Sequence, residues 1–239
     1  MRGVASVAGD ARILLHLLKG RAPAADHAAS LEAFYAPQAV DYDAFRARLL
    51  HGREEMIARL GILAGMRVVE LGCGTGSSLQ IMGPQVATLE RFDMVDLCDA
   101  LLAVARQRAA GQGNIVVQRA DATCWQPEQP VDRVFVSYAL TMIPDWRQVI
   151  ANASSMLKPD GRIGVVDFHQ PAGGMLNGFW RRWFAHDGVH LNAAHLTTLQ
   201  QSFADFWSEE RRAALPYLPF IRAPYYLFVG GRGMQQQVI

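Results

Sequence analysis

The stretch Val68-Val-Glu-Leu-Gly-Cys-Gly-Thr-Gly76 decides the fold. In it an apolar strand runs into a glycine-rich turn, and a helical pattern near residues 77–82 follows. Glycines in such a turn let backbone N–H groups approach a ligand at the start of a helix. The spacing is GxGxG, and Glu70 stands two residues before the first glycine. A carboxylate there disfavours a pyrophosphate and suits a ligand with a cationic amino-acid portion.

Two further carboxylates continue this pattern. Asp96 lies 20 positions after Gly76 (96 − 76), at the end of the next expected strand, where an acidic residue hydrogen-bonds ribose hydroxyls. Asp121 follows the third expected strand, beside Ala122, and is placed to accept a hydrogen bond from an adenine amino group. Because the carboxyl ends of parallel strands meet at one edge of a sheet, these carboxylates predict a nucleoside site at that edge.

From residue 66 onward, short apolar runs alternate with helical patterns. Apolar strands separated by crossover helices predict an α/β fold, in which a parallel sheet is covered by helices on both faces. We expect strands at residues 67–71, 92–96, 115–118, 133–137 and 162–168, and two closing strands near 206–211 and 225–230. We expect helices near residues 77–82, 98–110, 146–157 and 192–204, and a turn at 157–161.

The first 65 residues have a helical pattern and are predicted to form an N-terminal helical cap. Residues 66–239 are predicted to form the α/β domain, in one structural unit with this cap. Apolar residues at helical spacing from Phe45 to Leu60 predict a helix that begins at Asp41 or Asp43 and ends at Gly61 or Gly65. Shorter helices are expected at residues 11–18 and 30–35.

The composition excludes several classes of function. The 23 Lys+Arg and 22 Asp+Glu give a formal charge of +1, so no general attraction to nucleic acid is expected. No run of apolar residues is long enough to span a membrane, although 51% of the residues are hydrophobic. The three cysteines form no CxxC pair, which predicts a reducing, cytoplasmic setting.

At these motifs the chain resembles the class I S-adenosylmethionine-dependent methyltransferases, over roughly residues 40–170. The resemblance implies a Rossmann-like, seven-stranded methyltransferase sheet and S-adenosylmethionine as the cofactor. Glu70 would hold its methionine end, Asp96 its ribose and Asp121 its adenine. The cofactor-binding residues that we predict are Tyr42, Glu70, Gly72, Cys73, Gly74, Gly76, Asp96, Leu97, Asp121, Ala122 and Ser137. Glu70 and the GxGxG spacing disfavour a nicotinamide-dependent oxidoreductase. A domain that binds the cofactor without transferring methyl groups is a further alternative.

Residues 42–54, 179–191 and 223–230 resemble the betaine-lipid N-methyltransferases, which extends the resemblance to about residues 35–232. These enzymes convert diacylglyceryl-homoserine into its trimethylated betaine lipid, so the resemblance implies a polar lipid substrate. Phosphatidylethanolamine and soluble amines are the alternative acceptors. Apolar aromatic residues and two arginines in 176–184 have the pattern of a basic amphipathic helix. That pattern fits both an anchor on a membrane surface and a stripe that packs into the core. The sequence does not indicate an oligomeric state.

Four residues outside the cofactor motifs are candidates for catalysis. In the methyltransferase family the acceptor meets the cofactor above strands four and five, which here end near Tyr138 and His169. The ring of Tyr138 could attract a methylammonium group. Asp187 and His190 could orient an amine, or cap the next helix. No metal site is expected at His186 and His190, because the glutamate of HExxH is missing and Gly188 interrupts a helix between these two histidines.

Overall fold

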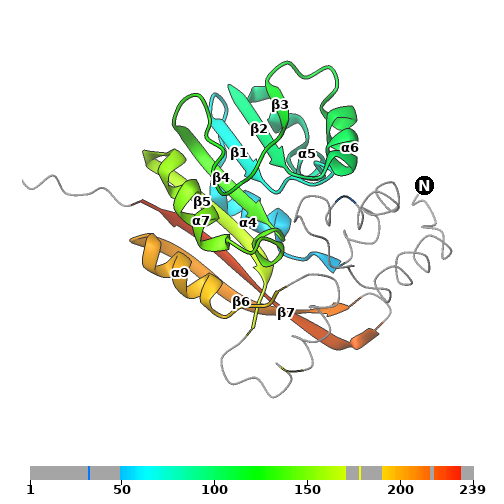
Figure 1. The fold of residues 1–239 in the computed structure, drawn as a ribbon, viewed down its shortest axis with the longest axis vertical. Helices are drawn as coiled ribbons and strands as arrows, with labels where there is room; N and C mark the ends of the chain where they lie inside the picture. The colour runs from blue at the N-terminus through cyan, green and yellow to red at the C-terminus, as the bar shows by residue number, and fades with distance from the viewer. Residues whose placement is uncertain (1–31, 33–48, 171–177, 179–189, 216–217, 233–239) are drawn as a thin grey trace, which may run out of the picture.

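The computed structural model describes residues 32, 49–170, 178, 190–215 and 218–232. Their core is a seven-stranded sheet with the order β3-β2-β1-β4-β5-β7-β6 (Figure 1). Strands β1 to β5 pair in parallel, whereas β7 runs antiparallel to both β5 and β6. The strands are β1 (Arg67–Leu71), β2 (Arg91–Asp96), β3 (Ile115–Arg119), β4 (Val131–Ser137), β5 (Leu157–Phe168), β6 (Asp205–Leu215) and β7 (Leu218–Gly231).

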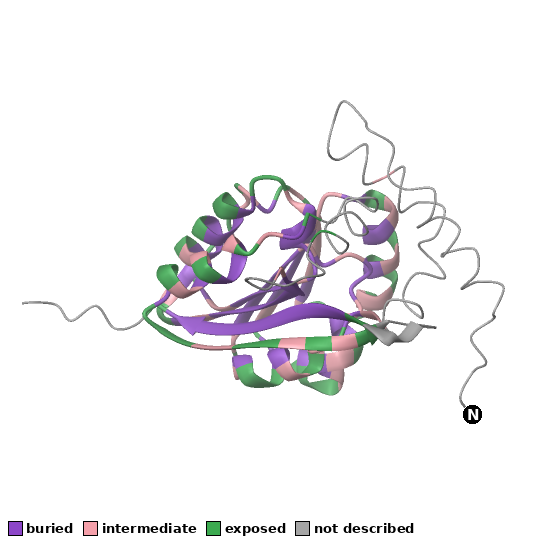
Figure 2. Ribbon diagram, turned by 90° about the horizontal axis from the view of Figure 1, so that it is seen from below, coloured by how far each residue is buried: buried purple, intermediate pink, exposed green. Residues whose placement is uncertain are grey.

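Helices cover both faces of this sheet. One apolar cluster joins it to α4, α5 and α6, and a second joins it to α7 and α9. Figure 2 shows buried strands between helices whose outer sides are exposed. The helices are α4 (Arg53–Leu60), α5 (Ser78–Met82), α6 (Asp99–Ala109), α7 (Trp146–Met156) and α9 (Ala194–Ser202), with 3-10 helices η2 (Gly83–Thr88) and η3 (Leu140–Met142). The predicted fold class, a Rossmann-like methyltransferase sheet with helices on both faces, is confirmed.

Two local predictions were wrong. The helix predicted between Asp41 or Asp43 and Gly61 is interrupted before α4, because Gly52 has a φ of 81° that a helix does not accommodate. Its end at Gly61 is confirmed, with a φ of 66°. The predicted turn at residues 157–161 belongs to β5, where Leu157 pairs with Val131 before an irregularity in the register.

The register brings the ends of the central strands to one edge. Leu71, the last residue of β1, lies opposite Val95 of β2 and Val136 of β4. Ser137, the last residue of β4, lies opposite Val166 of β5. The loops that follow these strands therefore start side by side, and they carry the predicted site residues.

None of the described helices is long and apolar enough to cross a membrane. Apart from residues 32 and 178, the helices expected at residues 11–18, 30–35 and 176–184 lie outside the described residues. The division into a cap and a methyltransferase domain stays a prediction. Within the predicted cap, α4 is described, and it packs against the sheet through Met56, Ile57 and Leu60.

Candidate functional site

A cavity of about 250 Å³ opens at the carboxyl edge of the sheet. Its wall is built by the loops after β1, β2, β3 and β4 and by the segment that leads into α4. Ten of the predicted site residues line it: Glu70, Gly72, Cys73, Gly74, Asp96, Leu97, Asp121, Ala122, Ser137 and Tyr138. Sequence positions that are far apart thus form one site, as the strand-end argument predicts.

The glycines of the loop after β1 have two different roles. Gly72 and Gly74 have φ values of 74° and 54°, which L-residues with side chains rarely adopt. A Cβ atom on Gly74 would meet nothing closer than a Leu101 carbon at 3.9 Å, so this glycine faces the open cavity. A Cβ atom on Gly76 would lie 2.9 Å from the Met94 Cε atom. Gly76, predicted to bind the cofactor, lies outside the cavity wall and allows the loop to pack closely on β2.

Glu70 is a buried carboxyl group at the end of β1. It is 1% exposed and accepts a hydrogen bond from the Ser78 hydroxyl. Burial raises its pKa to about 7, while Ser78 and the nearby charge of Arg53 oppose this shift. A carboxyl group with this pKa is partly ionised near neutrality. A cationic ligand group would favour its charged form.

The other two carboxylates are fixed by backbone amides. The Gly74 amide donates to Oδ2 of Asp96 at 2.8 Å, and the Cys98 amide donates to Oδ1 at 2.9 Å. The Thr123 amide and hydroxyl donate to Oδ1 of Asp121 at 2.8 and 2.7 Å. Each carboxylate oxygen has two lone pairs, so both groups can still accept hydrogen bonds from a ligand.

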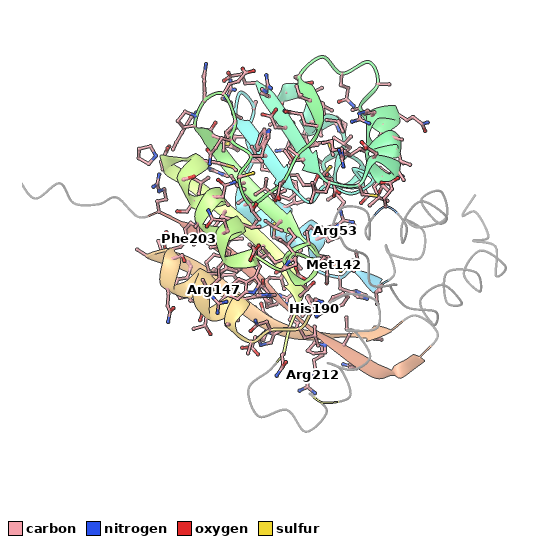
Figure 3. The ribbon with its side chains drawn as sticks, in the orientation of Figure 1. Arg53, Met142, Arg147, His190, Phe203 and Arg212 are labelled. Atoms are coloured by element: carbon pink, nitrogen blue, oxygen red, sulfur yellow. The ribbon has the colours of Figure 1, made fainter. Side chains whose placement is uncertain are left out.

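Arg53 is a cation in the cavity wall. The arginine begins α4, and its Nε atom donates to the Ser137 hydroxyl at 2.9 Å. Figure 3 labels it beside Met142, which lines the same cavity. Its sequence neighbourhood suggests only a substrate contact or a solvated helix residue. The turn at Gly52 directs it into the site, and no sequence motif marks that turn as functional.

Tyr138 has an unusual backbone next to the cavity. Among the described residues it is the one non-glycine residue with a positive φ, 55°. Its hydroxyl donates to the His51 carbonyl at 2.7 Å, and its ring packs edge-on against Phe168 with centroids 4.8 Å apart. Strained backbone of this kind persists where the surroundings enforce it, and it often marks a functional position.

The other predicted catalytic residues lie away from the cavity or outside the described residues. Asp187 is outside them, as is Tyr42, which was predicted to bind the cofactor. His190 is exposed, and its amide donates to the Thr141 carbonyl at 2.7 Å (labelled in Figure 3). His169 is buried, with its Nε2 atom 3.0 Å from Oε2 of Glu210. Neither histidine lines the cavity.

Asp167 ties the cavity wall to the end of β5. Its carboxylate accepts hydrogen bonds from the Thr141 hydroxyl at 2.7 Å and from the Thr141 amide at 3.1 Å. Burial raises its pKa to about 6, against these hydrogen bonds. Thr141 lies in η3, between the cavity-lining residues Ala139 and Met142. Asp167 therefore holds the segment that forms this wall.

Comparison with known proteins agrees with this geometry. Residues 68–161 match the family model of a methyltransferase domain. The 2-phytyl-1,4-naphtoquinone methyltransferase of Synechococcus elongatus is 27% identical over 205 residues, which cover 80% of this chain and 88% of that protein. The trans-aconitate 2-methyltransferase of Variovorax paradoxus is 30% identical over 113 residues, 47% of this chain and 42% of that protein.

A solved structure shows the same fold at low sequence identity. Phosphoethanolamine N-methyltransferase 2 of Haemonchus contortus, in complex with phosphomonomethylethanolamine and S-adenosylhomocysteine, superposes with a TM-score of 0.71. The match covers 88% of this chain and 61% of that chain at 16% identity. Together these comparisons place a methyltransferase domain at residues 68–161 and show that the chain has the fold of the S-adenosylmethionine-dependent methyltransferases.

The residues of the cavity fit S-adenosylmethionine, its cofactor. Glu70 suits the cationic amino group of the methionine portion, and Arg53 suits its carboxylate. Asp96 can accept hydrogen bonds from the ribose, and Asp121 from the adenine amino group. The open side of Gly74 leaves room for a ligand against the loop backbone.

Proposed function

We propose that this class I methyltransferase methylates the amino group of a polar lipid headgroup, and that diacylglyceryl-homoserine is its acceptor. Successive transfers would give the trimethylated betaine lipid. The stretches at residues 42–54, 179–191 and 223–230, which resemble the betaine-lipid N-methyltransferases, support this acceptor. Phosphatidylethanolamine and soluble amines are the alternative amine acceptors.

The observation that carries the proposal is the position of Tyr138. Tyr138 lines the cavity, and its hydroxyl and its contact with Phe168 fix the orientation of its ring. An aromatic ring attracts methylated ammonium groups and tolerates their increasing bulk. Leu50, Met142 and Ile143 extend the wall with apolar side chains. An aromatic ring beside an apolar wall suits an amine attached to a lipid.

For methyl transfer to an amine, the protein mainly has to align the methyl donor with the acceptor nitrogen. When bound, the cofactor supplies a methyl group on a positively charged sulfur. Glu70, Asp96 and Asp121 hold the donor, while the apolar wall excludes water from the acceptor side. The ring of Tyr138 attracts the amine to a position within reach of the methyl group. The acceptor must present an uncharged nitrogen, so its proton has to leave first.

A second candidate is methylation of a ring carbon of a lipid-soluble quinol. It is favoured by the similarity to the 2-phytyl-1,4-naphtoquinone methyltransferase, which extends over 80% of this chain. An apolar cavity wall also suits a prenylated ring. The two candidates differ in the acceptor atom, so product analysis separates them.

The test is incubation of the purified chain with methyl-labelled S-adenosylmethionine and one acceptor at a time. The acceptors are phosphatidylcholine vesicles that contain diacylglyceryl-homoserine, vesicles that contain phosphatidylethanolamine, free phosphoethanolamine, and a reduced phytyl-naphthoquinone. Labelled mono-, di- and trimethylated homoserine lipid on thin-layer chromatography is the expected result. Label that appears only in the quinol, in phosphatidylethanolamine or in the soluble amine contradicts the proposed acceptor. Asp96→Ala serves as the control that cannot hold the cofactor.

A further inference from the structure

The turn that follows β3 forms the cavity wall at the adenine position. We call residues 120–125 the adenine turn, and the first four of them line the cavity. At its start the Ala120 amide donates to the Asp96 carbonyl of β2 at 3.0 Å. At its end the Trp125 amide donates to the Asp121 carbonyl at 2.8 Å. These two hydrogen bonds close the adenine turn and tie its start to the strand that carries the ribose carboxylate.

Asn152 of α7 holds the adenine turn from the other side. Its Nδ2 atom donates to the Ala122 carbonyl at 3.0 Å and to the Trp125 carbonyl at 2.8 Å. A side-chain amide has two N–H groups, so both are used on this turn. Its Oδ1 atom accepts a hydrogen bond from Nε2 of Gln126 at 2.5 Å. Because backbone carbonyl oxygens only accept hydrogen bonds, the Asn152 amide has one satisfactory orientation here.

The position of Asn152 in α7 does not call for a polar residue. Asn152 is 7% exposed and shares the buried face of the helix with Trp146, Val149, Ala153 and Met156. Asparagine is a weaker helix former than most residues, and its amide is costly to bury unless each polar atom is paired. Packing on the sheet alone would favour an apolar residue at this position. The amide is used on the adenine turn, and since Asn152 does not line the cavity, it acts through that turn.

The adenine turn offers a hydrogen-bond acceptor next to a donor. The Asp121 carboxylate can accept a hydrogen bond, and the neighbouring Ala122 amide has no partner among the described residues. Adenine presents an amino group beside the ring nitrogen N1, which is a donor next to an acceptor. Hypoxanthine presents a carbonyl oxygen and an N–H at the same two positions, so its pattern is reversed. Recognition of adenine therefore depends on the backbone between Asp121 and Ala122, and Asn152 holds the carbonyl of Ala122.

We propose that Asn152 is a positioning residue for the cofactor, which sets the Asp121 carboxylate and the Ala122 amide at the spacing that selects adenine over hypoxanthine. The inference concerns the methyl donor and does not depend on which acceptor is methylated. Without the Asn152 amide, the carbonyls of Ala122 and Trp125 lose their hydrogen-bond donor beside α7. An unpaired buried carbonyl is unfavourable, so the turn shifts until both oxygens find other partners. The two groups that face adenine shift with it.

Asn114 provides a matched control. It directly precedes β3, at the opposite edge of the sheet from the adenine turn. Its Nδ2 atom donates to the carbonyls of Val86 and Leu89 at 2.8 and 3.1 Å, so it makes the same pair of hydrogen bonds as Asn152. None of these three control residues lines the cavity. Loss of either asparagine amide should destabilise the fold, but only loss of Asn152 should change how the base is recognised.

The test compares Asn152→Leu with Asn114→Leu by isothermal titration of S-adenosylhomocysteine and of S-inosylhomocysteine, its hypoxanthine counterpart. A ratio of two affinities cancels any change in the folded fraction, so a merely structural defect leaves it unchanged. We expect the unaltered chain to bind the adenine ligand about 10- to 100-fold more tightly. Asn152→Leu should lower this ratio by about tenfold, while Asn114→Leu should keep it within about twofold of the unaltered chain.

A second variant tests the same role if Asn152→Leu folds poorly. Gln126→Ala removes the exposed side chain that donates to the Asn152 amide, and it should lower the ratio by about threefold. Hydrogen exchange without ligand should also be faster at the Trp125 amide in Asn152→Leu than in Asn114→Leu.

Three outcomes would overturn the proposal. They are an unchanged ratio in Asn152→Leu, or in Gln126→Ala where the leucine variant does not fold; an equal fall of the ratio in Asn114→Leu; and an unaltered chain that binds both ligands equally well. Each of these outcomes leaves the proposed lipid acceptor untouched, because that acceptor is tested by the labelled products and not by the base of the cofactor.

Discussion

The carboxylate of Asp96 accepts a hydrogen bond from the amide of Gly74 at 2.8 Å. The bond joins the end of β2 to the loop after β1, so one residue both shapes the loop and faces the ribose position. We expect Asp96→Asn to weaken the binding of S-adenosylhomocysteine by about 10- to 100-fold and to lower the free energy of unfolding by about 1–3 kcal/mol. Isothermal titration and urea unfolding measure the two effects.

Asp99→Asn is the matched control for that variant. Asp99 lies three residues away in α6 and pairs with Arg119 on the surface, where an ion pair contributes about 1 kcal/mol or less. Equal losses of cofactor affinity in both variants would argue against a specific role for Asp96.

Gly72 is predicted to tolerate no side chain. A Cβ atom there would lie 2.4 Å from the Cβ of Ala139, and the φ of 74° is unfavourable for alanine. We expect Gly72→Ala to lower the free energy of unfolding by about 2–4 kcal/mol and to weaken cofactor binding. In Gly113→Ala nothing lies within 4 Å of the new atom, so its unfolding free energy should change by about 0.5 kcal/mol or less. Similar unfolding midpoints for the two variants would show that the close contact with Ala139 does not destabilise Gly72→Ala.

Glu70 makes both stability and cofactor binding depend on pH. Its pKa is raised from 4.5 to about 7, so the folded chain holds this proton more tightly than the unfolded chain. Its contribution to stability is fully present below pH 4.5 and is lost as the pH rises through 7. Relative to Glu70→Gln, the unaltered chain should therefore lose stability between these values. Urea unfolding at several pH values measures the difference in the free energy of unfolding. Asp167, with a pKa of about 6, is present in both proteins, so its titration contributes equally to both.

Binding of the cofactor should show the opposite trend. The cationic amino group of S-adenosylhomocysteine favours ionised Glu70, so its affinity should rise by up to about tenfold between pH 6 and 8. Glu70→Gln should bind more weakly and lose this dependence. An affinity of the unaltered chain that stays constant over this range would contradict the assignment of Glu70 to the amino group.

Tyr138 allows the ring and the hydroxyl to be tested separately. Tyr138→Phe removes the hydrogen bond to the His51 carbonyl and should lower the free energy of unfolding by about 1 kcal/mol, with kcat largely retained. Tyr138→Leu removes the aromatic ring and should lower kcat with the amine acceptor by about tenfold or more, because the attraction for methylammonium is lost. Steady-state kinetics with labelled cofactor measure this. If the leucine variant were as active as the phenylalanine variant, the ring would not be needed.

Much of the fold was predictable because its signals are local. Strands β1 to β4 were found within two residues of their observed ends, since each is a short apolar run between polar turns, whereas β7 begins seven residues before its predicted start. The cofactor carboxylates were predictable for a related reason. A residue at the end of a parallel strand has its place fixed by the strand itself, so Glu70, Asp96 and Asp121 could be assigned from their spacing.

The break before α4 shows where local signals fail. Apolar residues keep helical spacing across Gly52, and at the turn there a Cβ atom would lie 2.9 Å from the Tyr225 ring of β7. Arg53 enters the cavity only because of this turn. The antiparallel pairing of β7 with β5 and β6 could not be predicted from these patterns either, because apolar and alternating residues do not indicate the direction of a partner strand.

The sequence by itself determined the glycine loop, the three carboxylates and the α/β order of elements, because each depends on backbone chemistry within a few neighbouring residues. Only the tertiary structure decided that Arg53 lies beside Glu70 and that Glu210 lies against His169. These pairs join residues from different elements, and their meeting depends on strand register and on the packing of α4. Neither is encoded in the spacing of residues along the chain.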